Sequence, residues 1–505
     1  MRLRPWLAAA LLLAPAAASA APLAPAAGVQ ALVFDTAVRF DINELSVAIP
    51  NFGPIARDYR PEQIGLEWPQ GSGQRLIHGA GLWLVSYARQ DVPRSAMADF
   101  GSEFTPGIMD GAGNATDPYG DDASNYVHKI SRTDLSDPGH DWLTWPINEG
   151  APLDSIGHPR LIGDQTLYNT FNDAFQGAHH NLDGSSPRLQ AEVHQTVFGS
   201  NRQLSLARVM YVHYEIKNRS SFRWPEFYVG MWADPDIGDP YDDLAGADSA
   251  LKAAYAYDSA PSVAGSPPPA VGVCVLLDSL RNRPVPPVHA ISSWTSETDP
   301  ESYEQALNLA RGYTKSGENW MCGPDTTKFL YDGDPFSGTG CLDPVPGDKR
   351  LLVSTGPFDV NPGALIDVVI AYVVGSRAGA TSVAENVQAL REGFAAAREG
   401  WVNLFSDALP VPASPALSPA SPNPFRGATG FQFALPVGVM ASEIQVLDMR
   451  GRLLWKEPAL MPHDGYYQVY WDGQTLAGTS APTGVYFFRL ITDHGPFTQK
   501  AVRLR

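Results

Sequence analysis

Six aspartates fall within fifteen residues of sequence, from Asp234 to Asp248, and this segment has the clearest potential for chemistry. Glycines and prolines between the aspartates allow the chain to turn sharply, so several carboxylates can converge. Hard divalent cations such as Ca²⁺ bind about six to eight oxygens from carboxylates and loop carbonyls. The sequence therefore predicts a Ca²⁺ site, whose candidate ligands are Asp234, Asp236, Asp239, Asp242 and Asp243.

The same segment also fits a simpler interpretation, in which solvated aspartates cap backbone amides within turns. No glutamate follows at the twelfth position of the loop, so the EF-hand motif is excluded. Two neighbouring histidines, His179 and His180, lie near Asp183, but adjacent ring side chains seldom point toward one ion. A second acidic, glycine-rich segment could bind a cation by the argument used above, with the side chains of Asp110, Asn114, Asp117, Asp121 and Asp122.

The three cysteines suggest a disulfide rather than a redox or zinc site. Cys322 and Cys341 enclose a loop rich in Gly, Asp and Pro, and are the candidate disulfide pair, which leaves Cys274 over. The sequence contains no C-x-x-C motif, which argues against thiol redox chemistry and structural zinc.

Signatures of common enzymes are absent from the sequence. There is no G-x-S-x-G elbow, H-E-x-x-H motif, P-loop or dinucleotide-binding glycine pattern. With 54 acidic residues, a pair of carboxylates for glycoside hydrolysis cannot be assigned. Four aromatic residues near the acidic segments could form a sugar-stacking platform, although core packing explains them more simply: Trp142, Trp145, Tyr228 and Trp232.

Composition and charge restrict the possible partners. The formal net charge is −18 at pH 7, and no long run of Lys or Arg occurs, which argues against nucleic acid as a partner. Arg2 and Arg4 precede an apolar stretch that ends at a small-residue cleavage site (ASA, residues 18–20). This order predicts a secretory signal peptide at residues 1–20, followed by a short leader at 21–30. We expect no transmembrane helix after signal cleavage, and a secreted or cell-surface location.

Short apolar segments between turn residues predict a mainly β fold. Val209–Ile216 (VMYVHYEI) alternates, whereas Leu365–Val374 (LIDVVIAYVV) is almost continuously apolar, as in a strand covered on both faces. Residues 110–188 are rich in Asp, Asn, Gly and Pro, and predict long loops with few regular elements. One helix begins at a capping box, Ser382–Glu385, and has an apolar stripe that should pack on the sandwich: Val387, Leu390, Phe394, Ala397, Trp401 and Leu404.

These segments predict the domain organisation. A large β-sandwich-like domain with the packed C-terminal helix spans residues 31–408, and a Pro/Ser-rich linker spans 409–422. Residues 423–505 follow as a small β-sandwich. Several motifs occur in order within this last segment: NPF (423–425), DMRGR (448–452), WDG (471–473), PTGVYFFRL (482–490) and a basic final strand.

On these motifs, residues 423–505 resemble the C-terminal sorting domain of type IX secretion substrates, and the Ig-like domain of the flagellar hook-capping protein. The resemblance implies an Ig-like sorting or anchoring domain, with the secretion machinery of the outer envelope as a partner. It further implies that Lys500, Arg503 and Arg505 are recognised by that machinery. The middle region resembles uncharacterised secreted bacterial proteins with such tails, in the stretches 229–248, 347–363 and 368–375. That second resemblance implies one shared β-rich domain and no chemistry.

Three functional hypotheses remain open at this point. The first is a secreted structural or ligand-binding β-sandwich, stabilised by Ca²⁺ and requiring no other cofactor. The second is a secreted hydrolase that acts on polysaccharide or protein. The third is an adhesin or a subunit of an extracellular assembly, with an extracellular glycan or protein as its partner. The first is favoured because the acidic segments look structural and no nucleophile–base pair is evident.

Overall fold

The computed structural model describes most of the chain between Thr36 and Leu504. The predicted signal peptide and leader, Asp121, Arg505 and most of the linker lie outside the described residues. Described are residues 36–57, 65–87, 93–110, 113–120, 122–135, 137–154, 157–259, 267–276, 288–405, 416–417, 420, 423–427, 429–434, 441–458, 466–493 and 495–504.

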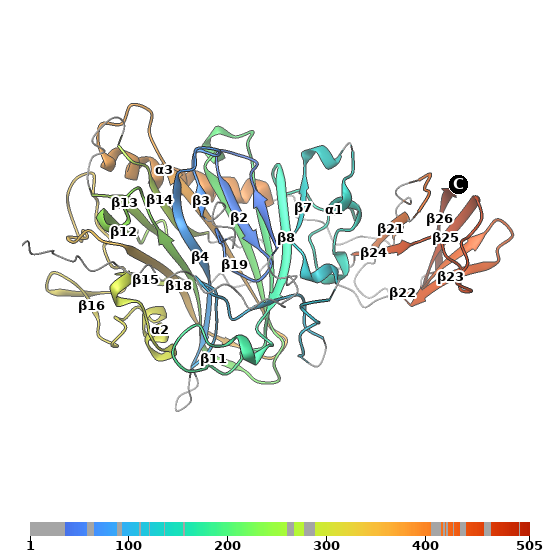
Figure 1. Ribbon diagram of the computed structural model, residues 1–505, viewed down its shortest axis with the longest axis horizontal. Helices are drawn as coiled ribbons and strands as arrows, with labels where there is room; N and C mark the ends of the chain where they lie inside the picture. The colour runs from blue at the N-terminus through green and yellow to red at the C-terminus, as the bar shows by residue number, and fades with distance from the viewer. Residues whose placement is uncertain are drawn as a thin grey trace, which may run out of the picture. The chain divides into compact units, whose positions relative to one another are not determined.

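Two antiparallel sheets face each other in the main body, by which we mean the described residues from 36 to 405 (Figure 1). The eight-stranded first sheet has the order β1 (Ala37–Phe40), β2 (Ser46–Pro50), β3 (Leu66–Glu67), β4 (Arg75–Ser86), β11 (Trp224–Pro235), β18 (Lys349–Val360) and β15 (Val288–Thr295), with β5 (Arg94–Met97) paired to β4. The nine-stranded second sheet has the order β12 (Asp243–Asp248), β13 (Ala253–Asp258), β14 (Ala270–Leu276), β19 (Leu365–Gly375), β10 (Val209–Asn218), β9 (Ala191–Gly199), β8 (Gln165–Asn172) and β6 (Thr105–Pro106), with β7 (His128–Ser131) paired to β8.

The core between the two sheets follows from the alternation of side chains along each strand. On β10, Val212 and Tyr214 face the core, as do Val229 and Met231 on β11 of the opposite sheet. On β19, alternate residues face this core and the others face the packed helix, which explains the almost continuous apolar run. The prediction of a mainly β, sandwich-like fold is confirmed.

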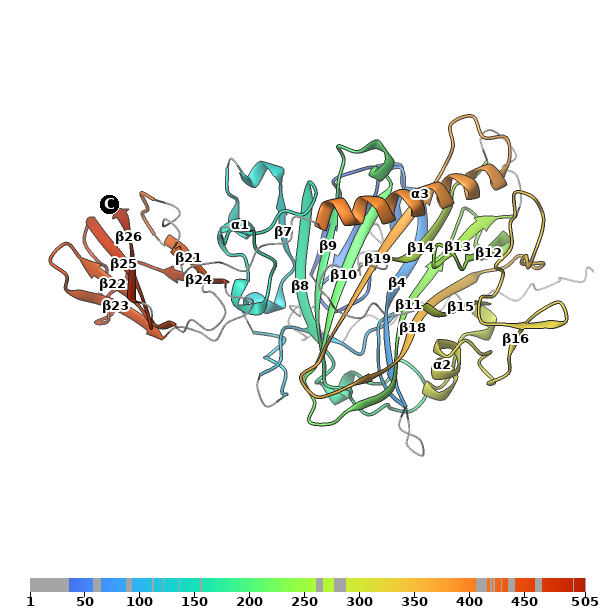
Figure 2. The ribbon, with the colours of Figure 1, turned by 180° about the vertical axis from the view of Figure 1, so that it is seen from behind.

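Helix α3 (Val383–Phe405) covers the outer face of the second sheet, where it crosses β10, β19 and β14 (Figure 2). At its start, the Glu385 amide donates to Ser382 Oγ at 3.4 Å, and the Glu385 carboxylate accepts from the Thr381 amide at 2.6 Å. The Phe394 and Trp401 side chains are buried in the cluster between helix and sheet. The predicted apolar stripe is therefore the packing face of this helix.

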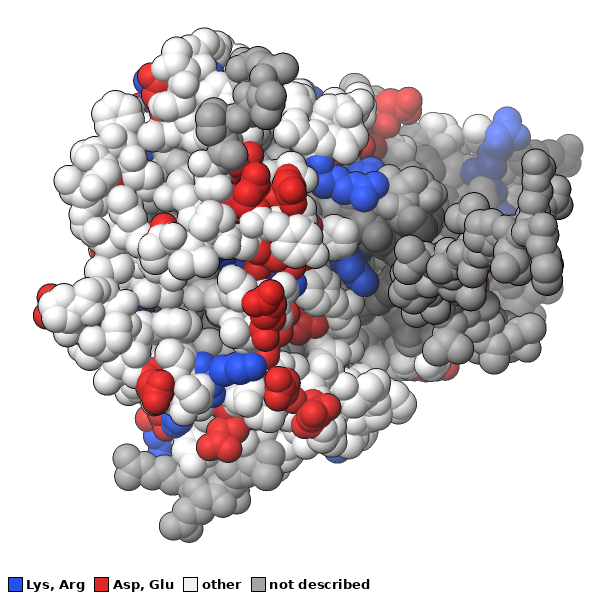
Figure 3. Space-filling view, turned by 60° about the vertical axis from the view of Figure 1, so that its left-hand side comes forward, with Lys and Arg blue, Asp and Glu red and all other residues white. Residues whose placement is uncertain are grey.

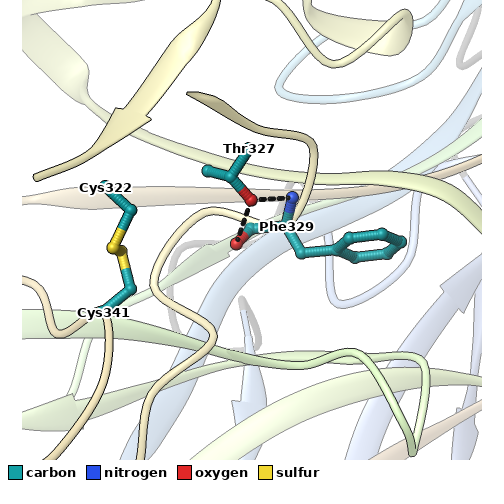
Figure 4. Close-up of a disulfide and its surroundings, with 4 residues drawn as sticks. All are labelled: Cys322, Thr327, Phe329 and Cys341. Atoms are coloured by element: carbon teal, nitrogen blue, oxygen red, sulfur yellow. Dashed lines mark hydrogen bonds between the residues drawn. A yellow bond between two sulfur atoms is a disulfide. The ribbon is translucent and has the colours of Figure 1, made fainter. Parts of the chain in front are cut away.

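Shorter elements cover the outer face of the first sheet. Helix α2 (Tyr303–Ala310) packs on a cluster that contains Trp83, Trp232 and Trp294. A hairpin of β16 (Trp320–Cys322) and β17 (Asp325–Thr327) lies in the segment after this helix. Cys322 and Cys341 form a disulfide there, with their Cα atoms 5.7 Å apart (Figure 4). Cys274 is a buried free thiol on β14. Thr327 Oγ1 accepts from the Phe329 amide at 2.9 Å and fixes the turn beside the disulfide.

The C-terminal module, residues 416–504 as described, has its own pair of sheets. Its three-stranded sheet has the order β20 (Ala416–Leu417), β21 (Thr429–Ala434), β24 (Tyr466–Trp471). Its four-stranded sheet has the order β23 (Leu453–Pro458), β22 (Ala441–Asp448), β25 (Gly484–Thr492), β26 (Gly495–Arg503). Phe431, Trp471 and Phe488 meet in the core, where the Phe431 and Phe488 ring centroids lie 4.5 Å apart.

The structure corrects the expectation of few regular elements in residues 110–188. Strand β8 is fully buried there, because Leu167 and Phe171 face the core and Tyr168 packs under a covering loop. Its other residues are Thr, Asn and Gln, so its pattern does not look like that of a buried strand.

None of the helices among the described residues is long and apolar enough to cross a membrane. The remaining short helices are α1 (His140–Leu143), η3 (Ala123–Asn125), η4 (Arg132–Leu135), η5 (Ile147–Glu149), η6 (Gln176–Ala178), η7 (Leu204–Leu206), η8 (Pro240–Asp242) and η9 (Ser296–Thr298).

Candidate metal centre

Three carboxylates converge in the first sheet, where strand β11 ends beside the start of its neighbour β18. Asp234 lies near the end of β11, and its side chain is on the outer face because Ala233 faces the core. Asp236 follows two residues later, and Asp348 comes directly before β18. Carboxylate oxygens of Asp234, Asp236 and Asp348 lie within 4.8 Å of one another. We call these three residues, together with Asp299 and Arg350, the acidic corner.

Arg350 is the cation inside the acidic corner, and only 6% of its side chain is exposed. Its guanidinium forms ion pairs with Asp234 and, at 2.5 Å, with Asp348. Its Nε lies 3.4 Å from Asp299 Oδ2, and its Cζ lies 5.3 Å from the ring centroid of Phe100. One buried positive charge therefore faces several negative ones, of which Asp234 is buried and the others are partly exposed.

The titration of the acidic corner reflects burial first, and the neighbouring negative charges second. Burial raises the pKa of Asp234 to about 8, even though Arg350 acts in the opposite direction. Burial also raises the pKa of Asp236 and of Asp299, and the neighbouring carboxylates add to both shifts. His78 Nδ1 lies 3.7 Å from Asp236, and this contact acts in the opposite direction on the pKa of Asp236 without cancelling the effect of burial. A divalent cation at this place would replace the protons that these carboxylates otherwise retain.

The other predicted ligands have local roles. Asp239 accepts from the Tyr241 amide at 3.1 Å and so caps the short helix η8. Asp242 is half-buried beside it, and burial raises its pKa. Asp243 is fully buried, accepts from the Ile237 amide at 3.1 Å, and has its pKa raised to about 9 by burial. Among the described residues, none of these three belongs to a group of potential ligands like that of Asp234.

The second acidic segment shows the capping pattern as well. Asp110 accepts from the Asn114 amide at 2.9 Å, Asp117 from the Tyr119 amide at 3.0 Å, and Asp122 from the Ser124 amide at 2.9 Å. Of the aromatic residues considered for sugar stacking, Trp145, Tyr228 and Trp232 are buried and Trp142 is half-buried.

His179 and His180 differ in environment, since His179 is buried and His180 is exposed. His179 Nδ1 lies 3.1 Å from Ser186 Oγ, and its Nε2 lies 3.7 Å from Asp173 Oδ2. Asp173 in turn accepts from the Leu189 amide at 2.6 Å. The order of these groups is that of a nucleophile, a base and an acid. Because all three side chains are almost fully buried, however, the group is a polar network inside the protein and not a site open to substrate.

Sequence reasoning found Asp234 and Asp236 but missed Asp348, Asp299 and Arg350. More than sixty residues separate the nearest of these from Asp236 along the chain, and only the pairing of β11 with β18 and of β18 with β15 brings them together. The available signal was the charged triplet Asp348–Arg350 before an apolar run.

Acidic side chains also gather more widely on the face of the main body that carries β12, β15 and β16 (Figure 3).

Comparison with known proteins identifies no family. No family model matches the chain, and no curated protein sequence does. Among solved structures, a polysaccharide lyase is 7% identical with a TM-score of 0.18, over 62% of this chain and 34% of that one. Dimeric latent PorU from Porphyromonas gingivalis is 11% identical with a TM-score of 0.16, over 67% of this chain and 31% of that one. PorZ, a surface component of the type IX secretion system of the same bacterium, is 13% identical with a TM-score of 0.14, over 68% and 42%. This chain thus spans less than half of each, and TM-scores this low do not establish a common fold.

Proposed function

We propose that this protein is exported to the cell surface, that its C-terminal module is a sorting or anchoring domain, and that its main body is a structural or ligand-binding sandwich. The observation that carries this proposal is the separate core of the C-terminal module. All residues of that core cluster lie between Leu417 and Ala501. A module that closes its own core can be recognised by an export system without participation of the main body.

The motifs that support the resemblance to sorting domains contact each other in this module. Asn423, of the NPF motif, accepts from the Val502 amide at 2.8 Å and donates to the Lys500 carbonyl at 3.1 Å. Phe425 adds backbone hydrogen bonds to Val502 and Leu504 at 2.9 and 2.7 Å. The opening motif therefore fixes the position of the final strand, β26, which lies at the edge of the four-stranded sheet.

The two basic residues of β26 have different environments. The Lys500 side chain is exposed, so it is accessible to a partner. The Arg503 guanidinium donates to the Gly473 carbonyl and, at 2.9 Å, to Ser480 Oγ. We infer that Lys500 takes part in recognition by the secretion machinery, whereas Arg503 also holds β26 against the loop after β24.

Export is the direct test of this proposal. In a bacterium with a type IX secretion system, we expect the full chain at the cell surface and the chain without residues 423–505 in the periplasm. Lys500→Ala should reduce surface display without lowering the melting temperature, and Arg503→Ala should lower both. Lys456→Ala, an exposed lysine on β23, is the matched control and should behave as the wild type. Surface display of the truncated chain at the wild-type level would disprove the sorting role.

We further propose that the acidic corner binds Ca²⁺ through Asp234, Asp236 and Asp348. The excess negative charge around Arg350 and the raised pKa values of Asp234 and Asp236 support this assignment. Since carboxylates bind Ca²⁺ in the ionised form, binding must release protons. Asp236 is the best position for a substitution, because its side chain pairs with His78, whereas Asp234 and Asp348 pair with Arg350.

Thermal melting tests the Ca²⁺ site. Relative to EDTA, millimolar Ca²⁺ should raise the melting temperature of the wild type, and more at about pH 9 than at about pH 5, because Asp234 is ionised only at the higher pH. Asp236→Asn should remove this increase, whereas Asp239→Asn, which alters a helix cap outside the acidic corner, should keep it. An equal melting temperature of the wild type in EDTA and in Ca²⁺ at both pH values would exclude the site.

A further inference from the structure

A histidine and two carboxylates form a second group of potential ligands on the outer face of the second sheet. His213 and Glu215 are two residues apart on β10, so their side chains point to the same side of the sheet. Asp367 lies on the neighbouring strand β19 and is paired directly with Glu215 in the register. We call His213, Glu215 and Asp367 the sheet-face site. It belongs to a different sheet from the acidic corner and shares no residue with it.

The distances within the sheet-face site suit a single ion. His213 Nε2 lies 2.9 Å from Asp367 Oδ1, and one ligand atom from each of the three residues lies within 4.8 Å of the other two. Two ligands of a tetrahedral Zn²⁺ ion, each bound at about 2.0–2.1 Å, lie about 3.3 Å from each other. Small rotations of the side chains are therefore sufficient to bring all three ligand atoms into bonding positions.

The backbone of the sheet-face site is rigid, and the site reaches solvent. Strands β10 and β19 are interior strands of the sheet, since β9 pairs with β10 and β14 pairs with β19. The His213 side chain is only 6% exposed and lies near Trp401 of helix α3, at 6.5 Å between ring centroids. Asp367 is 19% exposed and Glu215 is half-buried. The imidazole is thus held in place, and an ion can enter from the side of the carboxylates.

The type of ligand decides the class of ion. Ca²⁺ and Mg²⁺ are bound in proteins by oxygen ligands, so an imidazole nitrogen argues against them. One imidazole and two carboxylates suit first-row transition ions, and Zn²⁺ accepts such a mixed set of nitrogen and oxygen ligands. Three protein ligands leave the fourth position of a tetrahedral Zn²⁺ for water or for an external ligand.

We propose that His213, Glu215 and Asp367 bind one divalent transition-metal ion, and that Zn²⁺ is the ion that fits this set of ligands. This site is independent of the Ca²⁺ site and of the sorting role. Its failure would leave both unchanged, and their failure would leave this site unchanged.

Calorimetric titration of the EDTA-treated full chain with ZnCl₂ tests the site. The wild type should bind one Zn²⁺ ion that Asp236→Asn also binds, because Asp236 belongs to the acidic corner. Glu215→Gln and Asp367→Asn should each weaken Zn²⁺ binding strongly. Loss of a residue that only supports a metal ligand weakens binding by about 10–100-fold, and loss of a ligand itself should weaken it more. Asp359→Asn, at an exposed ion pair with Arg223 on the first sheet, is the matched control and should bind as the wild type does. Equal Zn²⁺ affinity in the wild type, Glu215→Gln and Asp367→Asn would overturn the proposal, as would no binding by the wild type.

Co²⁺ absorption tests the site in the wild-type protein, so the result does not depend on whether a variant folds. Tetrahedral Co²⁺ absorbs visible light much more strongly than the hexaaquo ion does. We expect Co²⁺ to gain such a band on binding the wild-type protein, and Zn²⁺ to remove it in a stoichiometric titration. A spectrum that remains that of the hexaaquo ion would also overturn the proposal. In His213→Gln, loss of the imidazole nitrogen should abolish the band.

Discussion

Replacement of Arg350 by methionine is expected to lower the free energy of unfolding of the main body by about 3–5 kcal/mol, the range observed when one partner of a buried ion pair is removed. The substitution leaves the carboxylates of Asp234, Asp348 and Asp299 without the guanidinium that contacts all three. Methionine keeps much of the side-chain volume, so the change is mainly electrostatic. Urea unfolding followed by tryptophan fluorescence measures the effect.

The pH dependence separates this charge effect from a packing effect. Asp234 has a pKa of about 8 in the folded protein and about 3.9 in an unfolded chain, so its stabilising contribution is complete below about pH 4 and is lost as the pH rises through about 8. Without Arg350, the carboxylates retain protons to a still higher pH. The destabilisation by Arg350→Met should therefore be larger at about pH 9 than at about pH 5, and Ca²⁺ should partly reverse it.

Arg391→Met is the control for the first prediction. Arg391 contacts Asp248 at 3.3 Å and Asp334 at 3.1 Å, but 24% of its side chain is exposed. Solvent-exposed ion pairs contribute about 0–1 kcal/mol, and the pairs of Arg391 are closer to this case than those of Arg350, so this variant should lose less stability than Arg350→Met. If Arg350→Met were no more destabilising than Arg391→Met, or equally destabilising at both pH values, Arg350 would not be the charge that stabilises the acidic corner.

Replacement of Glu192 by glutamine should have the second largest effect on the free energy of unfolding. Here a buried carboxylate is surrounded by cations, whereas in the acidic corner a buried cation is surrounded by carboxylates. Glu192 on β9 is fully buried, and its Oε1 accepts from Arg219 at 2.7 Å and lies 3.7 Å from Lys217 Nζ. Its Oε2 accepts from the Met109 amide at 2.7 Å. The amide removes the negative charge and leaves the two cations. We expect a loss of about 2–4 kcal/mol in the free energy of unfolding at neutral pH, because Arg219 and Lys217 are partly exposed and can be solvated in part.

The effect of Glu192→Gln should decrease in acid. Hydrogen bonds from His194 and Arg219, together with their charges, hold the pKa of Glu192 far below its usual range despite burial. Its contribution to stability is therefore complete above the unfolded value of about 4.3 and is lost as the pH falls further. The difference in stability between the wild type and the variant should decrease steadily as the pH falls below about 4. Glu226 pairs with Arg311, and 34% of the Glu226 side chain is exposed. Glu226→Gln should therefore change the free energy of unfolding much less than Glu192→Gln does. A difference between wild type and Glu192→Gln that stays constant from neutral pH to acid would contradict the electrostatic explanation.

The sequence determined those elements whose apolar residues form a clear pattern, either a regular repeat or an unbroken run. Strand β10 and helix α3 were predicted because their apolar residues repeat at two-residue and at three- to four-residue spacing, and β19 because its apolar run is almost continuous; each element faces a large core. Cys322 and Cys341 were also recognisable as candidates for pairing, and the structure joins them. Strand β8 was missed because its covered face carries Thr, Asn and Tyr; Thr170 and Asn172 there are buried because they donate hydrogen bonds to carbonyls of other segments.

The candidate sites depended on the tertiary structure to a greater extent. The acidic loop was visible in sequence, but the cluster consists of Asp234, Asp236 and Asp348, and its cation is Arg350. His213 and Asp367 are separated by 154 residues and become neighbours only through the pairing of β10 with β19. Local sequence records the spacing of side chains along one strand, whereas a site on a sheet is built across strands. The register between strands, set by burial of the whole core, therefore decided which charges meet.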